Sequence, residues 1–298
     1  MKFTFLGTGT SVGVPQIGCD CKVCASKDPR DKRRRCGAYV RGESAAVLID
    51  TPPEMRLACC ELGISKVDAV VLTHAHMDHV AAFDDVRRFN TINGEKVSCD
   101  PNEPGANGRT FRIIGRPMTC YAMQETAEQM HRIFPYIGTQ GGQNGLFRPQ
   151  IGFDTEDEFQ ISDLRFQRLK VEHGFPCCGY KISEEVRVKS EELMNDEFHS
   201  QPSTSTSLAY ISDCHVIPDE TIGKIRGVDT LVLNCLRERQ HPTHLSLERA
   251  KEYIAAIAPR KAYLIHMCHD FTHEEWLAKL AGTSIEPAYD GLEIEVKK

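Results

Sequence analysis

The sequence lacks three features, and each absence narrows the class of protein. No apolar run approaches the ~18–20 residues that a bilayer span requires, so we predict no membrane segment. Basic residues are not in excess, because 42 Asp and Glu outnumber 36 Lys and Arg and leave a net charge of −6. This acidic balance disfavours nucleic acid as a partner, since phosphate backbones bind to positive surfaces. No internal repeat is evident.

We also expect no secretory leader. The apolar stretch at residues 3–6 is short and ends at glycine, which is not typical of an export signal. Cysteine, by contrast, is abundant, with 13 residues that include two adjacent pairs. Without export context we expect a cytoplasmic protein in which most thiols are reduced and a few bind metal. The 41% hydrophobic content is enough for one large domain over residues 1–298.

The densest cluster of chemically reactive side chains is Thr-His-Ala-His-Met-Asp-His at residues 73–79. It follows residues 67–72, an apolar run with β-branched side chains that predicts a buried strand. Ligands from so short a segment cannot all converge on one metal, but two neighbouring metals can share them. Imidazole and carboxylate suit zinc, iron or manganese. The pairs expected to serve the two metals are His74 with His76, and Asp78 with His79.

Polar residues recur where predicted strands end. Asp50, His74, Asp213 and His266 each follow a short apolar run. Residues at the ends of several core strands commonly build the site of an α/β protein. Helices are predicted over residues 53–62, 120–134, 246–258 and 274–281, and strands over residues 159–173 and 177–183.

The His-x-His-x-Asp-His motif after a strand, with later His, Asp and His at strand ends, resembles the metallo-β-lactamase superfamily. The resemblance extends from the glycine-rich loop at residues 7–15 to His273. It implies an α/β fold, a four-layer αββα sandwich with a two-metal cleft at one edge.

The resemblance also implies a role for each matching residue. His173 completes the ligands of the first metal, which also include His74 and His76. His266 joins Asp78 and His79 around the second metal, and Asp213 bridges the two ions. Asp50 orients the motif from behind the ligands. Such a metal pair activates water to hydroxide and neutralises an incoming phosphate.

A proton donor for the leaving group is expected in the segment His-Pro-Thr-His-Leu-Ser, just before a predicted helix. Its second histidine, His244, resembles the general acid of the phosphodiesterase branches. The residues expected to take a direct part in catalysis are therefore His244, Asp78 and Asp213.

A second metal site is predicted near the N-terminus. The Cys-x-Cys-x-x-Cys loop provides three thiolates, whereas a closed structural zinc site needs four ligands. Within the superfamily, the loop resembles that of the cyclic-phosphate phosphodiesterases of bacterial phosphonate breakdown. There a histidine three residues after the last catalytic ligand closes the site. The matching residues for a structural zinc are Cys19, Cys21, Cys24 and His269.

Three segments have open interpretations. The loop at residues 7–15 could bring the backbone N–H groups of Gly9, Thr10 and Ser11 to a phosphate, or could be an ordinary tight connection. The basic run at residues 32–35 fits a solvated loop as well as a surface that meets an anionic substrate. The segment near residues 93–118, rich in Gly, Pro and Asn, is predicted to be an insertion that serves as a lid or a partner surface.

The leading functional hypothesis is a metal-dependent phosphodiesterase for a small phosphate diester, with a cyclic ribose phosphate as one option. The alternatives are a tRNA 3′-processing-type endoribonuclease, a non-phosphate metallohydrolase of the same fold, and a binding module without catalysis. The types of ligand do not determine whether the catalytic pair is manganese, zinc or iron. A homodimer fits the resemblance.

Overall fold

The computed structural model describes residues 1–103, 106–138, 149–184 and 206–297. A first sheet contains, among these residues, seven strands in the order β16-β1-β2-β3-β4-β7-β8. Strands β3, β4, β7 and β8 are parallel, so their carboxyl ends meet at one edge. The strands are β1 (Lys2–Gly7), β2 (Gly37–Arg41), β3 (Ala46–Ile49), β4 (Ala69–Val71), β7 (Met118–Tyr121), β8 (Ile151–Asp154) and β16 (Glu293–Glu295).

A second sheet contains seven described strands in the order β15-β14-β13-β12-β11-β10-β9. Strands β12 to β15 are parallel, while β9 to β12 pair antiparallel. The strands are β9 (Glu158–Ile161), β10 (Leu164–Lys170), β11 (Cys178–Glu184), β12 (Thr206–Ile211), β13 (Thr230–Asn234), β14 (Lys261–Ile265) and β15 (Ile285–Pro287).

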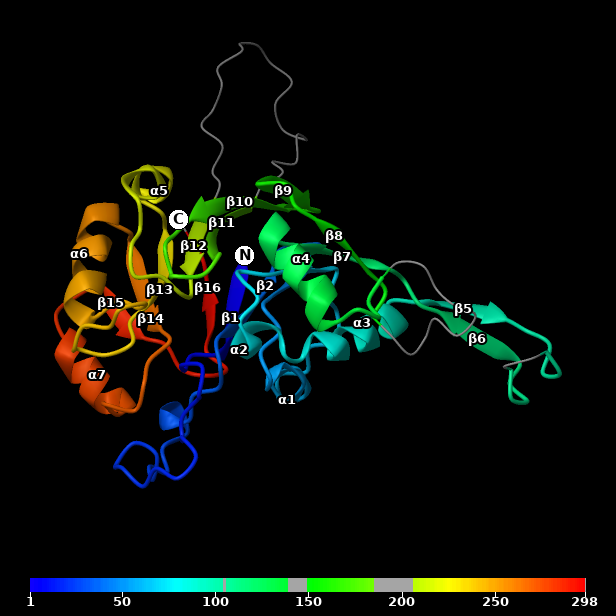
Figure 1. The fold of residues 1–298 in the computed structure, drawn as a ribbon, viewed down its shortest axis with the longest axis horizontal. Helices are drawn as coiled ribbons and strands as arrows, with labels where there is room; N and C mark the ends of the chain where they lie inside the picture. Colours follow the sequence, from blue (N-terminus) through cyan, green and yellow to red (C-terminus); the bar gives the residue numbers. More distant parts are fainter. Residues whose placement is uncertain (104–105, 139–148, 185–205, 298) are drawn as a thin grey trace, which may run out of the picture.

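Helices cover the outer face of each sheet, on opposite sides of the molecule (Figure 1). This arrangement confirms the predicted four-layer αββα sandwich. No described helix is long and apolar enough to cross a membrane. The helices on the first sheet are α1 (Met55–Glu61), α2 (Met77–Val80), α3 (Arg87–Ile92) and α4 (Gln124–Ile133). Those on the second sheet are α5 (Asp219–Ile225), α6 (Leu247–Ile257) and α7 (His273–Leu280), and short 3-10 turns occupy Pro29–Asp31 and Phe83–Val86.

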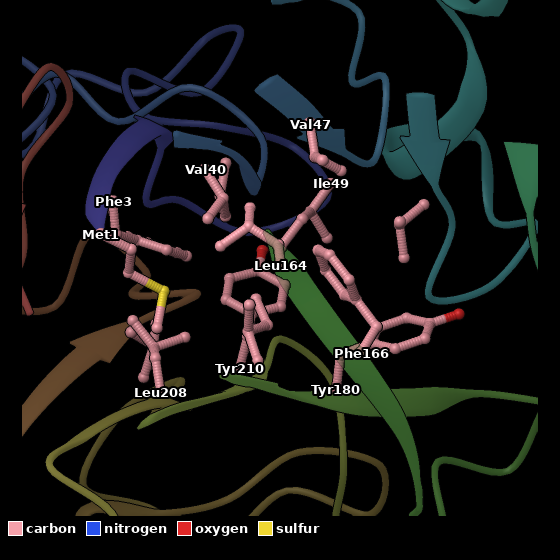
Figure 2. Packing of buried hydrophobic residues seen from close by; sticks show 14 of the residues in the cluster. Met1, Phe3, Val40, Val47, Ile49, Leu164, Phe166, Tyr180, Leu208 and Tyr210 are labelled. Carbon is pink, nitrogen blue, oxygen red and sulfur yellow. The ribbon is translucent and has the colours of Figure 1, made fainter. Parts of the chain in front are cut away.

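The two sheets pack face to face through a core rich in aromatic rings (Figure 2). The rings of Phe3 and Tyr210, one from each sheet, lie 5.8 Å apart. Side chains of this size bury large apolar areas and hold the sheets at a fixed separation. The strand ends that carry the predicted site residues therefore stand on a rigid scaffold.

Two of the predicted helices are confirmed near the C-terminus, as α6 and α7. Ser246 caps α6, because its side chain accepts a hydrogen bond from the Arg249 amide. The helix predicted over residues 120–134 is wrong at its start. Residues Met118–Tyr121 form β7 between β4 and β8, and α4 begins only at Gln124. Pairing in the middle of a sheet overrides the weak local preference.

One predicted strand is divided in the structure, and the predicted insertion contains two strands of its own. The long strand predicted over residues 159–173 is interrupted by a tight turn, where Ser162 has a φ of +53°. The segment near residues 93–118 contains a hairpin of β5 (Glu95–Ser98) and β6 (Phe111–Ile114), which projects from the body (Figure 1). Both hairpin strands are largely exposed on both faces, so no apolar alternation marks them in the sequence.

Candidate metal centre

The predicted site residues meet at one edge of the sandwich, where parallel strands end. Asp50 follows β3 directly, and His266 follows β14 directly. Both residues adopt the left-handed backbone region, with φ of 62° and 59°. Such conformations cost free energy in residues other than glycine, and they persist where surrounding contacts enforce them.

The histidine motif turns from strand into helix within a few residues. His74 lies beyond β4, and His76 is the N-cap of the short helix α2, which contains Asp78 and His79. His74 Nε2 lies 2.9 Å from His76 Nδ1, and Phe175 stacks on the His76 ring at 4.4 Å. This tight turn directs ligands from one short segment toward two neighbouring points.

Donor atoms converge there in four overlapping groups, and three of these contain only the predicted metal ligands. Within each group the candidate ligand atoms lie within 4.8 Å of one another. The first group combines the His-x-His pair with a histidine from the loop after β10, and the second adds the histidine after β14. A third group links the two through Asp213. These three groups are His74, His76 and His173; Asp78, His79 and His266; and His74, His79 and Asp213.

Asp213 lies between the two main groups. One carboxylate oxygen is 3.2 Å from His79 Nε2, and the other is 3.0 Å from His266 Nε2. Burial opposes ionisation of Asp213, but His266 and His79 hold its pKa well below the ordinary range. A buried carboxylate that stays charged here is suited to bind two cations at once. Asp213 therefore lies in the bridging position predicted for it.

Asp50 supports the motif from beneath. It is completely buried and accepts hydrogen bonds from the amide and hydroxyl of Thr73, both at 2.8 Å, and from His79 Nδ1 at 2.7 Å. Burial raises the pKa of Asp50, although His79 and Thr73 act in the opposite direction. These contacts fix the orientation of the His79 ring, so its Nε2 faces Asp78 and Asp213.

The donor set fits divalent metal ions. His79 Nε2, His266 Nε2 and one oxygen of Asp213 are buried and have no hydrogen-bond partner in the described part of the chain. Buried polar atoms without partners are costly, and a cation between them would satisfy all three. Burial lowers the pKa of His74 and His173, which favours the neutral imidazole that binds metals.

His244, the predicted proton donor, lies beside this cluster. Its Nε2 is 3.2 Å from Asp213, and its ring stacks on His266 at 4.5 Å. Its Nδ1 lies 2.9 Å from the hydroxyl of Thr243 and 3.2 Å from Nδ1 of His241. Sequence reasoning assigned no role to His241, although it shares the same short segment.

The cysteine loop meets His269 as predicted. The sulfur atoms of Cys19, Cys21 and Cys24 lie 3.3, 3.5 and 3.3 Å from Nδ1 of His269. Tetrahedral zinc places sulfur and nitrogen ligands about 3.5 Å apart, given bond lengths of ~2.3 and ~2.05 Å. The Cys24 amide lowers the pKa of Cys21 to about 6, which favours a thiolate. These residues fit a structural zinc.

The basic run at residues 32–35 differs from both interpretations of the sequence. Arg33 is 1% exposed and donates to the carbonyl oxygens of Cys268 and Phe271. The next two residues form ion pairs within the chain, Arg34 with Glu61 and Arg35 with Glu54. The run is therefore neither a solvated loop nor a free positive surface, and it ties the N-terminal loop to the segment after His266.

The glycine-rich loop is only partly available to a ligand. The Gly9 amide donates to the Arg34 carbonyl at 2.7 Å, so it is not free to meet a phosphate as predicted. A Cβ atom at Gly9 would lie 2.6 Å from the Arg33 carbonyl, which explains glycine at this close crossing. Thr10 and Ser11, in contrast, line a cavity beside His244.

Comparisons with known proteins agree with this geometry. A family model described as a beta-lactamase superfamily domain matches residues 46–267. A solved structure described as a new diphosphatase from the PhnP family is 31% identical, with 99% of this chain and 97% of that chain covered and a TM-score of 0.75. Zinc-bound PqqB from Methylobacterium extorquens is 17% identical, with 99% and 100% covered and a TM-score of 0.68, which shows a shared fold.

One curated relative carries a different kind of name. A Porphyromonas gingivalis protein named octanoyltransferase is 31% identical over 300 residues, covering 98% of this chain and 51% of that protein. The chain therefore spans about half the length of this relative. The family-model match, the histidine motif and the sandwich fold together show that the chain belongs to the metallo-β-lactamase superfamily.

Proposed function

We propose that the protein is a metal-dependent hydrolase that cleaves small phosphate diesters. The observation that carries this proposal is His244, placed 3.2 Å from the carboxylate that joins the two ligand groups. A histidine there can give a proton to an oxygen leaving a phosphorus atom. The similarity to a diphosphatase over nearly the whole of both chains supports phosphate chemistry.

Each of two ligand groups would bind one metal ion. His74, His76 and His173 would hold one ion, and Asp78, His79 and His266 the other, with Asp213 in contact with both. Manganese, zinc and iron all suit these ligands. When bound, two divalent ions supply positive charge that activates a water molecule and neutralises the phosphate oxygens.

His244 and its neighbours handle the proton. Burial lowers the pKa of His244, whereas the hydrogen bond with Asp213 acts to raise it. The carboxylate therefore opposes part of this lowering, and it orients the ring. The transfer moves the proton of Nε2 to the leaving oxygen as its bond to phosphorus breaks, and it leaves a neutral imidazole.

The alternative of a tRNA-processing nuclease has weaker support. A nuclease needs a track of unpaired Lys and Arg along the nucleic-acid backbone. The basic run that could provide one is engaged in buried and paired contacts within the chain. Acyl transfer, which the name of the Porphyromonas relative describes, is not proposed, because about half of that protein lies outside the match.

Elemental analysis combined with a diester assay tests the proposal. The purified protein should contain about three metals per chain and should hydrolyse bis(p-nitrophenyl) phosphate, with added Mn²⁺ increasing the rate. Asp213→Ala should lose the catalytic metals and the activity but keep the zinc of the cysteine site. Wild-type protein that is fully loaded with metal and cleaves no phosphate ester would contradict the proposal and favour a non-phosphate substrate.

A further inference from the structure

A cavity of about 230 Å³ opens beside the metal centre. His244 and His266 form the side that adjoins the metal centre, and the glycine-rich loop at residues 7–15 contributes another wall. The loop between β13 and α6 contributes Arg237 and His241. A substrate with its phosphate at the metal centre would therefore have further room on this side.

Arg237 is unusual among the arginines near the site. Its Nη2 makes one long hydrogen bond, 3.4 Å to the Gln240 carbonyl, and its Nε is buried without a partner. No carboxylate of the described residues forms an ion pair with it, whereas Arg33, Arg34 and Arg35 each have one. A guanidinium kept partly buried without a counter-charge is costly unless an anion binds to it.

The backbone holds Arg237 firmly in this position. Its carbonyl accepts a 2.9 Å hydrogen bond from the Leu247 amide at the start of α6. The preceding residue, Leu236, is hydrogen-bonded to Leu245 on one side and to Cys268 on the other, both at 3.0 Å. Arg237 thus lies between the segment that carries His244 and the segment that follows His266, and little reorganisation is needed to bind a ligand.

We propose that Arg237 binds a second, non-scissile phosphate of the substrate, and so selects substrates that carry two phosphate groups. The inference rests on the proposed function, because the first phosphate would occupy the metal centre. The planar guanidinium can donate two parallel hydrogen bonds to one phosphate. The inorganic analogue methylenediphosphonate, which cannot be hydrolysed at its P–C–P bridge, carries two such groups and serves as the probe.

Competitive inhibition of bis(p-nitrophenyl) phosphate hydrolysis, with Mn²⁺ in excess, tests this role. For wild-type protein, methylenediphosphonate should inhibit more strongly than inorganic phosphate. Arg237→Gln should raise the inhibition constant of methylenediphosphonate about 10- to 100-fold, the usual effect of losing a charge-assisted contact. The KM for the diester and the inhibition constant of phosphate should stay within about twofold, because neither probe carries a second phosphate.

Arg260→Gln is the matched control, since Arg260 is 60% exposed on its side chain, pairs with Asp229 at 3.6 Å and lies outside the cavity. It should leave all three constants near wild type. The inference about Arg237 would be overturned if Arg237→Gln left inhibition by methylenediphosphonate unchanged, or if it weakened inhibition by phosphate equally. Diester hydrolysis by wild type would still support the proposed function in that case. If wild type hydrolyses no diester, the proposed function fails, and calorimetric titration with methylenediphosphonate then tests Arg237 by itself.

Discussion

Nδ1 of His79 donates a 2.7 Å hydrogen bond to the buried carboxylate of Asp50. This bond occupies Nδ1, and it places the other ring nitrogen, Nε2, 3.2 Å from Asp213. The side chain directly after β3 therefore sets the direction of a candidate ligand that lies 29 residues later in the chain. Supports of this kind fix the orientation of metal ligands and so affect metal affinity.

Asp50→Asn should weaken metal binding about 10- to 100-fold. The amide keeps the volume of the side chain but turns one N–H group toward hydrogens that Asp50 now accepts from Thr73 or His79. Metal titration followed by elemental analysis checks this. Asp68→Asn is the control, because Asp68 accepts from the Ala46 amide away from the centre. Equal metal affinity in both variants would show that Asp50 has no supporting role.

His244→Ala should slow substrates with poor leaving groups far more than substrates with good ones. An alkyl alkoxide needs a proton as it departs, so the rate for a methyl ester should fall ~10²–10⁴-fold. A p-nitrophenolate leaves without help, so its rate should fall less than about tenfold. Metal content is measured in parallel, since His244 also lies within reach of His173 and Asp213 as a possible ligand. Equal losses for both substrates, or loss of metal, would refute the role of proton donor.

Cys21→Ser should remove one zinc per chain and leave the catalytic metals in place. Zinc at this site would join the N-terminal loop to the segment that carries His269, so its loss should lower the thermal midpoint by roughly 5 °C or more. Cys60→Ser tests for general effects of thiol loss, because Cys60 is exposed and outside the cluster. Unchanged zinc content in Cys21→Ser would rule out the structural site.

Asp290 should make the protein less stable as the pH rises. Burial raises the pKa of its carboxyl to about 7, against about 4 in an unfolded chain. The folded state therefore retains a proton that the unfolded state releases between these values, so stability falls with increasing pH across this window, by roughly 4 kcal/mol for three pKa units.

Asp290→Asn isolates this effect. The Asn oxygen can accept from the Arg34 amide, and its NH₂ can donate to the Thr8 hydroxyl, so both native contacts are retained. Urea unfolding at pH 5 and pH 8 should show a smaller difference for the variant than for wild type. A pH dependence identical in the two proteins would exclude Asp290 as its source.

The features that could be predicted from the sequence are those that depend on local spacing. The His-x-His-x-Asp-His motif after a buried strand, the Cys-x-Cys-x-x-Cys loop and the Ser246 cap each place their atoms through a few consecutive dihedral angles. Such geometry survives in any fold that contains the segment, so it could be predicted without knowing the neighbours. The resemblance to the superfamily then implied the distant partners, and the structure brings them together.

Features that depend on contacts between distant segments could not be predicted from spacing along the chain. Residues 118–121 form a strand because β4 and β8 flank them. Arg33 is buried because its guanidinium donates to the carbonyl groups of Cys268 and Phe271. For the same reason, no carboxylate in the described part of the chain pairs with Arg237, since charge pairing depends on which side chains are brought together by packing. Spacing along the chain does not predict such neighbours, because the packing of the two sheets against each other brings them together.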